Sequence, residues 1–254
     1  SRMTSQAHAK GLENEKRRIF STAIWLFFGL GLVCSVLMFF RADALARFLN
    51  NSLAATAVQA LAPAVFCVCL LACMRGYTQG QGNMTPTAVS QVLEALLKLG
   101  IGLPLAWYVL HIGKTAELSA AGAIVGVTAG TAVSMLFLCA YLVTHRNRKE
   151  SLDVPSSSGQ IIKQILLIGV PITLSNSAMS IINIIDTKIV MGRLQSALGL
   201  SETAAAVLNG QYSIAMDMPN MVASFIYPVT MSLIPFAAAA LARKDHAEAD
   251  RIIS

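Results

Sequence analysis

The stretch that decides the fold is residues 118–144, which read LSAAGAIVGVTAGTAVSMLFLCAYLVT and contain no charged side chain. A helix of about 20 apolar residues is long enough to cross the hydrocarbon core of a bilayer. These 27 residues therefore predict one transmembrane helix.

Outside this helix, further apolar runs have the length of a membrane span. They cover residues 19–40, 48–74, 86–110, 164–185 and 211–242. The 254-residue chain is 55% hydrophobic and 13% charged, whereas soluble domains have about 25% charged residues. This composition excludes a soluble protein and predicts an all-α, polytopic membrane helical bundle with six transmembrane helices.

The basic residues fall mainly on one side of this arrangement. The 19 Lys and Arg residues give a net charge of +6, but they are spread between apolar runs and form no basic face for nucleic acid. Thirteen lie on one side, Lys98 lies inside a span, and five lie on the other side: Arg41, Arg47, Lys114, Lys188 and Arg193. Because Lys and Arg are retained in cytoplasmic loops, we expect a multi-pass membrane protein with both ends of this chain in the cytoplasm. Its expected partners include membrane lipids and exclude nucleic acid.

Motifs of soluble enzymes do not occur in the sequence. It has no P-loop, no G-x-G-x-x-G, no H-E-x-x-H and no G-x-S-x-G. Cys69 and Cys73 share a helix face and could be drawn as half a metal site, but no His or carboxylate lies near them in sequence. We interpret the five cysteines as small apolar packing residues. The sequence therefore predicts no enzyme, no metal and no cofactor.

Small residues recur along one face of the helix at 118–144. Gly122, Gly126, Gly130 and Ser134 are spaced four apart, so a neighbouring helix can approach this face closely. The ridge is either a surface on which helices slide or a static helix contact, and the packing logic of membrane helices favours the static contact.

A polar stretch separates the fourth and fifth spans. Residues 145–159 read HRNRKESLDVPSSSG, and Pro155 and the serines after it are typical of a linker. We predict that residues 145–160 are a cytoplasmic linker between two lobes. Residues 1–144 would be the end of an N-terminal lobe with four spans, and 161–254 the start of a C-terminal lobe with two.

The most distinctive motif lies between the second and third spans. Residues 75–91 read RGYTQGQGNMTPTAVSQ. We predict that Gly76, Gly80 and Gly82 break the second helix, and that Thr85 caps the third with Pro86 in its first turn.

This loop resembles the R-G-Y-x-Q-G-x-x-N-M-T-P-T-A-x-S-Q loop of the stage V sporulation protein B and polysaccharide biosynthesis protein family. That family belongs with the MurJ-like flippases in the multidrug/oligosaccharidyl-lipid/polysaccharide flippase superfamily. Further segments that look like the family are residues 13–18, 61–63, 91–94, 169–171, 183–186 and 195–202.

The resemblance implies a two-lobed flippase fold of which this chain is a fragment, about helices three to eight. Helices missing on either side of it would complete the cavity. It also implies transport of a lipid-linked saccharide by alternating access, for the cell wall, the spore cortex or a polysaccharide. The alternatives are a cation-coupled multidrug exporter of the same superfamily and a non-transporting membrane partner in wall or spore assembly.

Charged side chains inside membranes are costly and are candidates for function. Glu94 and Lys98 lie four apart on one helix face, so an internal ion pair is the favoured interpretation over a pathway role. Asp217 has no basic residue within two turns of its helix, which the prolines at 219, 228 and 235 are expected to kink. It is either a cavity carboxylate or an outer-end carboxylate that reaches solvent.

A second acidic position lies at the outer end of the fifth span. Asp186 and Asn183 share a face there, and their oxygens could coordinate a small cation. By resemblance this helix lines the cavity, which implies coupling to Na+ or H+; pairing of Asp186 with Lys188 or Arg193 is the alternative. The candidates for the substrate or ion pathway are Asp186, Asn183, Asp217, Gln211, Arg75, Asn83, Glu94 and Lys98.

Overall fold

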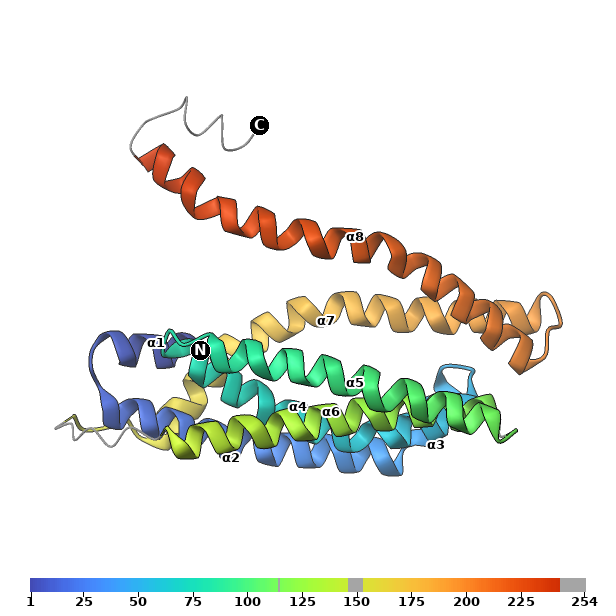
Figure 1. Cartoon of the computed structure of the whole chain (residues 1–254), viewed down its shortest axis with the longest axis horizontal. Helices are drawn as coiled ribbons and strands as arrows, with labels where there is room; N and C mark the ends of the chain where they lie inside the picture. The colour runs from blue at the N-terminus through green and yellow to red at the C-terminus, as the bar shows by residue number, and fades with distance from the viewer. Residues whose placement is uncertain (114, 146–152, 243–254) are drawn as a thin grey trace. The chain divides into compact units, whose positions relative to one another are not determined.

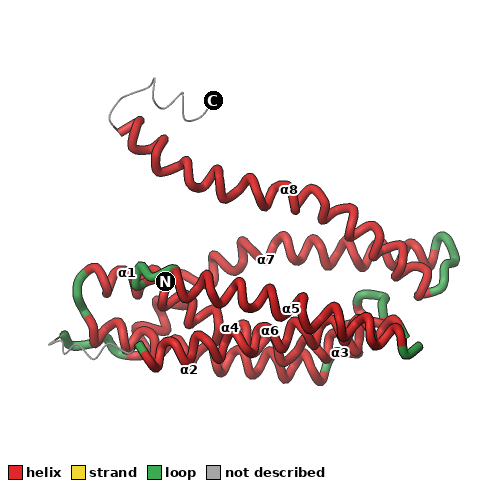
Figure 2. Tube along the Cα trace, in the orientation of Figure 1, coloured by secondary structure: helices red, strands yellow, loops and turns green. Residues whose placement is uncertain are grey.

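The computed structural model describes the backbone at residues 1–113, 115–145 and 153–242, and side chains in these ranges up to residue 222 and at 224. Every regular element in these ranges is a helix (Figures 1 and 2). The helices are α1 (Arg2–Ala9), α2 (Glu13–Phe40), α3 (Ala42–Phe48), the 3-10 turn η1 (Ser52–Ala54), α4 (Ala55–Gly80), α5 (Thr85–His111), α6 (Ala116–Thr144), α7 (Ser158–Ser196) and α8 (Glu202–Ala242).

The long helices match the predicted membrane spans. Within the described residues, five helical segments are long and apolar enough to cross a bilayer: α2, η1 with α4, α5, α6 and α7. The sixth predicted span, residues 211–242, lies within α8, most of whose second half has side chains outside the described set. The prediction of an all-α polytopic membrane bundle is therefore confirmed.

The helix of the second predicted span begins later and ends later than the sequence predicted. Residues 48–51 are not part of this helical span, which begins at Ser52, because Asn50 adopts a left-handed φ of 54° and separates α3 from η1. At the other end α4 continues through Gly76 to Gly80, and the chain turns at Gly82 with φ 78°. Of the three glycines expected to break the helix, only Gly82 adopts a conformation that requires glycine.

The start of α5 also differs from the prediction. Met84 occupies the N-cap position without a side-chain cap, so Thr85 is not the cap but the first helical residue. The side chain of Asn83 supplies the missing acceptor, since its Oδ1 accepts a hydrogen bond from the Thr85 amide at 3.2 Å. Pro86 lies in the first turn, as predicted.

The chain divides into two compact units, residues Ser1–Lys188 and Ile189–Ser254, which are described separately. In the first unit α5 packs on α6, α6 on α4, and α4 on α2. The long helices of this group run alongside one another in Figure 1. The second unit holds the end of α7, a turn with Gly199 at φ 63°, and α8. Helix α8 is continuous through Pro219, Pro228 and Pro235 and curves without a break.

The small-residue face of α6 is packed directly against α5. A Cβ on Gly126 would overlap the backbone N and Cα of Gly102, and one on Gly130 would lie 2.9 Å from the carbonyl oxygen of Glu94. Ser134 closes the contact because its hydroxyl donates to the Ser90 carbonyl at 3.0 Å. This face therefore forms a close contact between two helices, the static arrangement that the small-residue spacing favoured.

The end of the predicted linker is tied to the beginning of α2. The carboxylate of Asp153 accepts hydrogen bonds from the backbone amides of Asn14, at 3.2 Å, and Glu15, at 2.8 Å. The Asp153 carbonyl also accepts from the Asn14 side chain at 3.1 Å. Residues 146–152 of the linker lie outside the described residues, and the division into two lobes at 145–160 stays a prediction.

Candidate functional site

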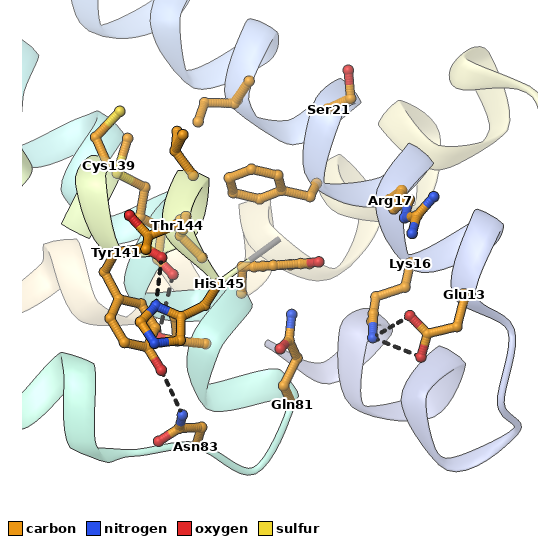
Figure 3. Close-up of a pocket in the computed structure, with 17 residues that line it drawn as sticks. Glu13, Lys16, Arg17, Ser21, Gln81, Asn83, Cys139, Tyr141, Thr144 and His145 are labelled. Carbon is orange, nitrogen blue, oxygen red and sulfur yellow. Dashed lines mark hydrogen bonds and ion pairs between the residues drawn. The ribbon is translucent and has the colours of Figure 1, made fainter. Parts of the chain in front are cut away.

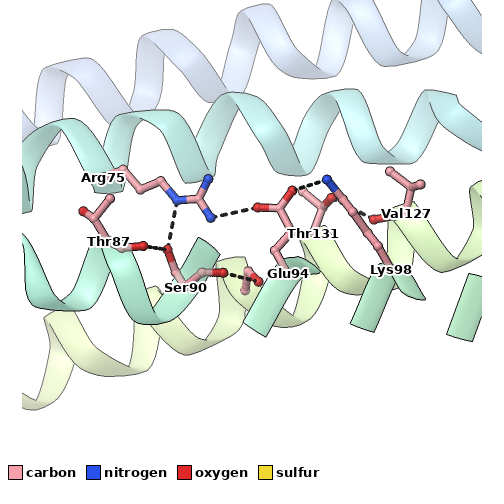
Figure 4. Close-up of polar contacts among 8 residues, drawn as sticks. Arg75, Thr87, Ser90, Glu94, Lys98, Val127 and Thr131 are labelled. Atoms are coloured by element: carbon pink, nitrogen blue, oxygen red, sulfur yellow. Dashed lines mark hydrogen bonds and ion pairs between the residues drawn. The ribbon is translucent and has the colours of Figure 1, made fainter. Parts of the chain in front are cut away.

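Three charged side chains from α4 and α5 form one ion-pair network, which we call the Arg75 cluster (Figure 4). Nη2 of Arg75 donates to Oε2 of Glu94 at 2.8 Å, and Nζ of Lys98 lies 2.7 Å from Oε1 of the same carboxylate. Nε of Arg75 donates to the hydroxyl of Ser90 at 2.9 Å. The predicted Glu94–Lys98 ion pair is therefore present, and Arg75 joins it from the neighbouring helix.

The cluster holds more positive than negative charge. Two cations share one carboxylate, and no second carboxylate pairs with them in the part of the chain that the structure describes. The side chain of Glu94 is 12% exposed and that of Arg75 is 18% exposed, whereas Lys98 is 37% exposed. The cluster therefore has a net charge of +1, and Lys98 is its most accessible member.

Neighbouring hydroxyl groups extend the cluster into a polar seam across three helices. Ser90 donates to the Thr87 carbonyl at 2.7 Å, and the hydroxyls of Thr87 and Thr78 lie 3.0 Å apart. Ser134 of α6 reaches the Ser90 carbonyl, so α4, α5 and α6 all contribute. These bonds satisfy buried polar groups that membrane hydrocarbon could not solvate.

Helix α6 fixes the position of Glu94 and Lys98 through a glycine. At Gly130 an added Cβ would meet the Lys98 amide nitrogen at 3.2 Å and its Cγ at 3.3 Å. The bare backbone of α6 therefore lies against the turn of α5 that carries both charges, and this contact limits their movement relative to α6.

Asn83 is directed away from the Arg75 cluster. Its side-chain nitrogen donates to the hydroxyl of Tyr141 at 3.1 Å (Figure 3), so it links the α4–α5 turn to the end of α6. The structure thus brings Arg75, Glu94 and Lys98 together, and it places Asn83 in a separate polar contact.

Asp186 and Asn183 lie one turn apart on α7, and both side chains are exposed. No ion pair joins Asp186 to Lys188 in the part of the chain that the structure describes, and the pairing of Asp186 with Lys188 or Arg193 stays an alternative. The Lys188 ammonium instead lies over the ring of Phe48, 3.9 Å from its centroid. The backbone carbonyl of Asn183 accepts a hydrogen bond from Thr187 at 2.9 Å.

Gln211 and Asp217 belong to the second unit and lie on α8, where both are exposed. Among the described residues no group of three or more His, Cys, Asp and Glu side chains could hold a metal ion. The five cysteines are free thiols.

Comparison with known proteins places the chain in a family. The sequence model of the family described as "Polysaccharide biosynthesis protein" matches residues 3–240. The chain belongs to the polysaccharide biosynthesis protein family. It is 26% identical over 240 residues to stage V sporulation protein B of Bacillus subtilis (strain 168), an alignment that covers 92% of this chain and 46% of that protein.

A second relative in the family is the uncharacterized membrane protein YabM of the same bacterium. It is 25% identical over 219 residues, which cover 85% of this chain and 41% of YabM. The chain thus spans less than half the length of both relatives. No solved structure matches it.

Family membership and the long apolar helices together identify a multi-pass membrane protein. Sequence reasoning found Glu94 and Lys98 but missed their link to Arg75, because that contact joins positions 19 residues apart on different helices. The signal that the sequence offers is that Glu94 is the one carboxylate of the third predicted span and that Arg75 directly follows the second span.

Proposed function

We propose that this protein moves a lipid-linked saccharide across the bacterial cell membrane by alternating access, as a transporter rather than an enzyme. The match to the polysaccharide biosynthesis protein family over residues 3–240 supports a role with polysaccharide precursors. A wall or spore-cortex precursor is the cargo that we propose, and the similarity to a protein named for stage V of sporulation supports it.

The observation that carries the proposal is the Arg75 cluster. Charged side chains within membrane-spanning helices are costly and usually mark a transport pathway. The cluster has one positive charge in excess, and Lys98 is its partly exposed member. An excess cation suits a cargo that carries negative charge, such as a saccharide joined to its lipid through phosphate.

The packing of α5 on α6 supports the alternating-access part of the proposal. Backbone contact at Gly102 and Gly126 and the hydrogen bond from Ser134 make these helices one body. Alternating access by rocking needs bodies that move as units. The Arg75 cluster would therefore change its exposure through movement of the whole body.

Coupling to Na+ or H+ belongs to the same proposal. The exposed carboxylates of Asp186 and Asp217 and the amides of Asn183 and Gln211 lie on α7 and α8. Oxygen ligands of this kind suit Na+, and a carboxylate can also accept a proton. An ion can drive transport only if it binds one state of the protein better than the other.

The test is a flipping assay on the full-length protein in proteoliposomes with a fluorescent lipid-linked saccharide. Lys98→Gln keeps the Arg75–Glu94 pair and removes the excess charge. We therefore expect the transport rate to fall about tenfold, which corresponds to the loss of one charged contact. Lys98→Arg should recover most of the activity. Arg41→Gln is the matched control, because Arg41 is exposed and lies after the end of α2.

Transport by Lys98→Gln at the wild-type rate would make the cluster structural. If the wild-type protein expels a cationic dye and leaves the saccharide in place, the drug-exporter alternative holds. If it moves neither, the protein is a non-transporting partner in assembly.

A further inference from the structure

A cavity of about 680 Å³ lies between the ends of α2, α4 and α6, and sequence reasoning did not predict it (Figure 3). We call it the α2–α4–α6 pocket. It is lined by the first turns of α2, the last turns of α4 and the last turn of α6. Arg75, Glu94 and Lys98 are not among its lining residues, so it is separate from the Arg75 cluster.

The lining of the pocket changes from polar to apolar along the helix axes. On α2 the order is Glu13, Lys16 and Arg17 at the helix end, then Phe20 and Ile24 further in. On α4, Gln81 lies just after the helix end and Met74 lies deeper. This gradient matches a molecule with a polar head and an apolar tail, because each part would meet lining of its own polarity.

The polar end of the pocket is cationic. Lys16 and Arg17 line it with one carboxylate, Glu13, which lies 2.7 Å from the Lys16 ammonium. The lining therefore has two basic side chains against one acidic side chain, and the second basic group is the guanidinium of Arg17. A guanidinium presents a planar fork of donors that matches phosphate oxygens.

Two ring pairs hold the pocket walls in place, one tilted and one stacked. The Phe20 and Tyr77 rings lie 4.3 Å apart, and the Tyr141 and His145 rings lie 4.2 Å apart. The hydrogen bond from Asn83 fixes the Tyr141 hydroxyl. Walls fixed before a ligand arrives reduce the entropy that binding costs.

We propose that the α2–α4–α6 pocket binds the phosphate head of an anionic lipid, with Arg17 as the phosphate contact and the region around Ile24 and Met74 receiving the first part of the lipid chain. The basic residues predict that this end of the bundle faces the cytoplasm, and basic pockets between transmembrane helices on that side suit anionic head groups. The site does not depend on the proposed transport activity.

Two lipids carry this chemistry: a resident phospholipid such as phosphatidylglycerol, and a polyprenyl phosphate of the kind that carries saccharides. Arg17 also has a purely structural alternative. Helices α4 and α6 end here, and a cation near helix C-termini is favourable without any ligand. The experiment must separate these cases.

The experiment is native mass spectrometry of the full-length protein in detergent, with each lipid added in turn: phosphatidylglycerol, undecaprenyl phosphate and, as a probe without phosphate, diacylglycerol. Two variants remove the site in different ways. Arg17→Gln removes the phosphate contact, and Gln81→Trp fills the pocket without changing its charge. Arg41→Gln makes the same charge change near the opposite end of α2.

We expect wild-type protein and Arg41→Gln to bind at least one phosphate lipid about tenfold more tightly than either pocket variant does. Arg17→Gln loses one charge-assisted contact, which is worth about this factor. Gln81→Trp fills the space that the lipid would occupy. Retention of phosphatidylglycerol alone identifies a resident lipid, and retention of undecaprenyl phosphate alone identifies a carrier lipid. Equal binding by wild type and Gln81→Trp, or diacylglycerol bound as tightly as the phosphate lipids, would overturn the proposal. If Arg17→Gln does not fold, Gln81→Trp decides alone.

Discussion

The close contact between α5 and α6 gives a prediction whose size can be worked from the structure. A methyl group on Gly126 would overlap the N and Cα of Gly102. Carbon atoms normally approach to about 3.5–4.0 Å, so Gly126→Ala must push the helices apart by roughly 1 Å.

Backbone atoms on both sides of this contact cannot rotate out of the way, as a flexible side chain could. We therefore expect a destabilisation of about 2–3 kcal/mol, the upper part of the range for overpacking a core. Two neighbouring glycines serve as reference positions for this stability change. Gly100 of α5 has open space around its Cβ position, and a Cβ on Gly122 of α6 would meet its nearest atom at 3.5 Å, an ordinary contact.

The assay is reversible unfolding of the full-length protein in mixed micelles, with the denaturing detergent as titrant. The stability change of Gly100→Ala reports the difference in helix propensity alone, and we expect Gly122→Ala to change stability by a similar amount. Gly126→Ala should unfold at clearly lower denaturant than both. If all three variants unfold together, the backbone contact does not contribute to stability and the one-body interpretation of α5 and α6 fails.

Three shorter predictions concern the linker, the ion and the orientation. Asp153→Ala removes the cap of α2 and should cost about 1 kcal/mol in the same assay, as helix caps usually do; an unchanged stability would show that water replaces the carboxylate. Asp186→Asn should abolish the dependence of transport on a Na+ or H+ gradient at normal protein abundance, whereas full dependence would leave Asp186 as an interfacial charge. In a background without native cysteines, a cysteine at Gly113 should react with an impermeant thiol reagent added outside cells and one at Ser157 should not. The reverse pattern would contradict the predicted topology.

Local sequence was enough for the features that depend on a single helix. The uncharged run at 118–144 became α6, and the four-residue spacing of Glu94 and Lys98 became an ion pair. The glycine spacing of α6 predicted a close neighbour, although only the structure identifies that neighbour as α5.

Features that depend on several helices could not be obtained in this way. The pairing of Arg75 with Glu94 and the pocket between α2, α4 and α6 arise from packing. The short helices α1 and α3 carry too few residues for a periodic pattern. Helix α4 passes Gly76 because glycine permits a turn but does not impose one.

The hydrogen bonds of Asp153 have a consequence for how α2, α4, α5 and α6 are attached to the rest of the chain. They bring the residue that leads into α7 against the first turn of α2, so the polypeptide enters and leaves the α2–α6 group at one corner. The chain between α6 and α7 is therefore held against the start of α2 by both the carboxylate and the carbonyl of Asp153. Exchange of the amide hydrogens of Asn14 and Glu15 would report each time these hydrogen bonds open.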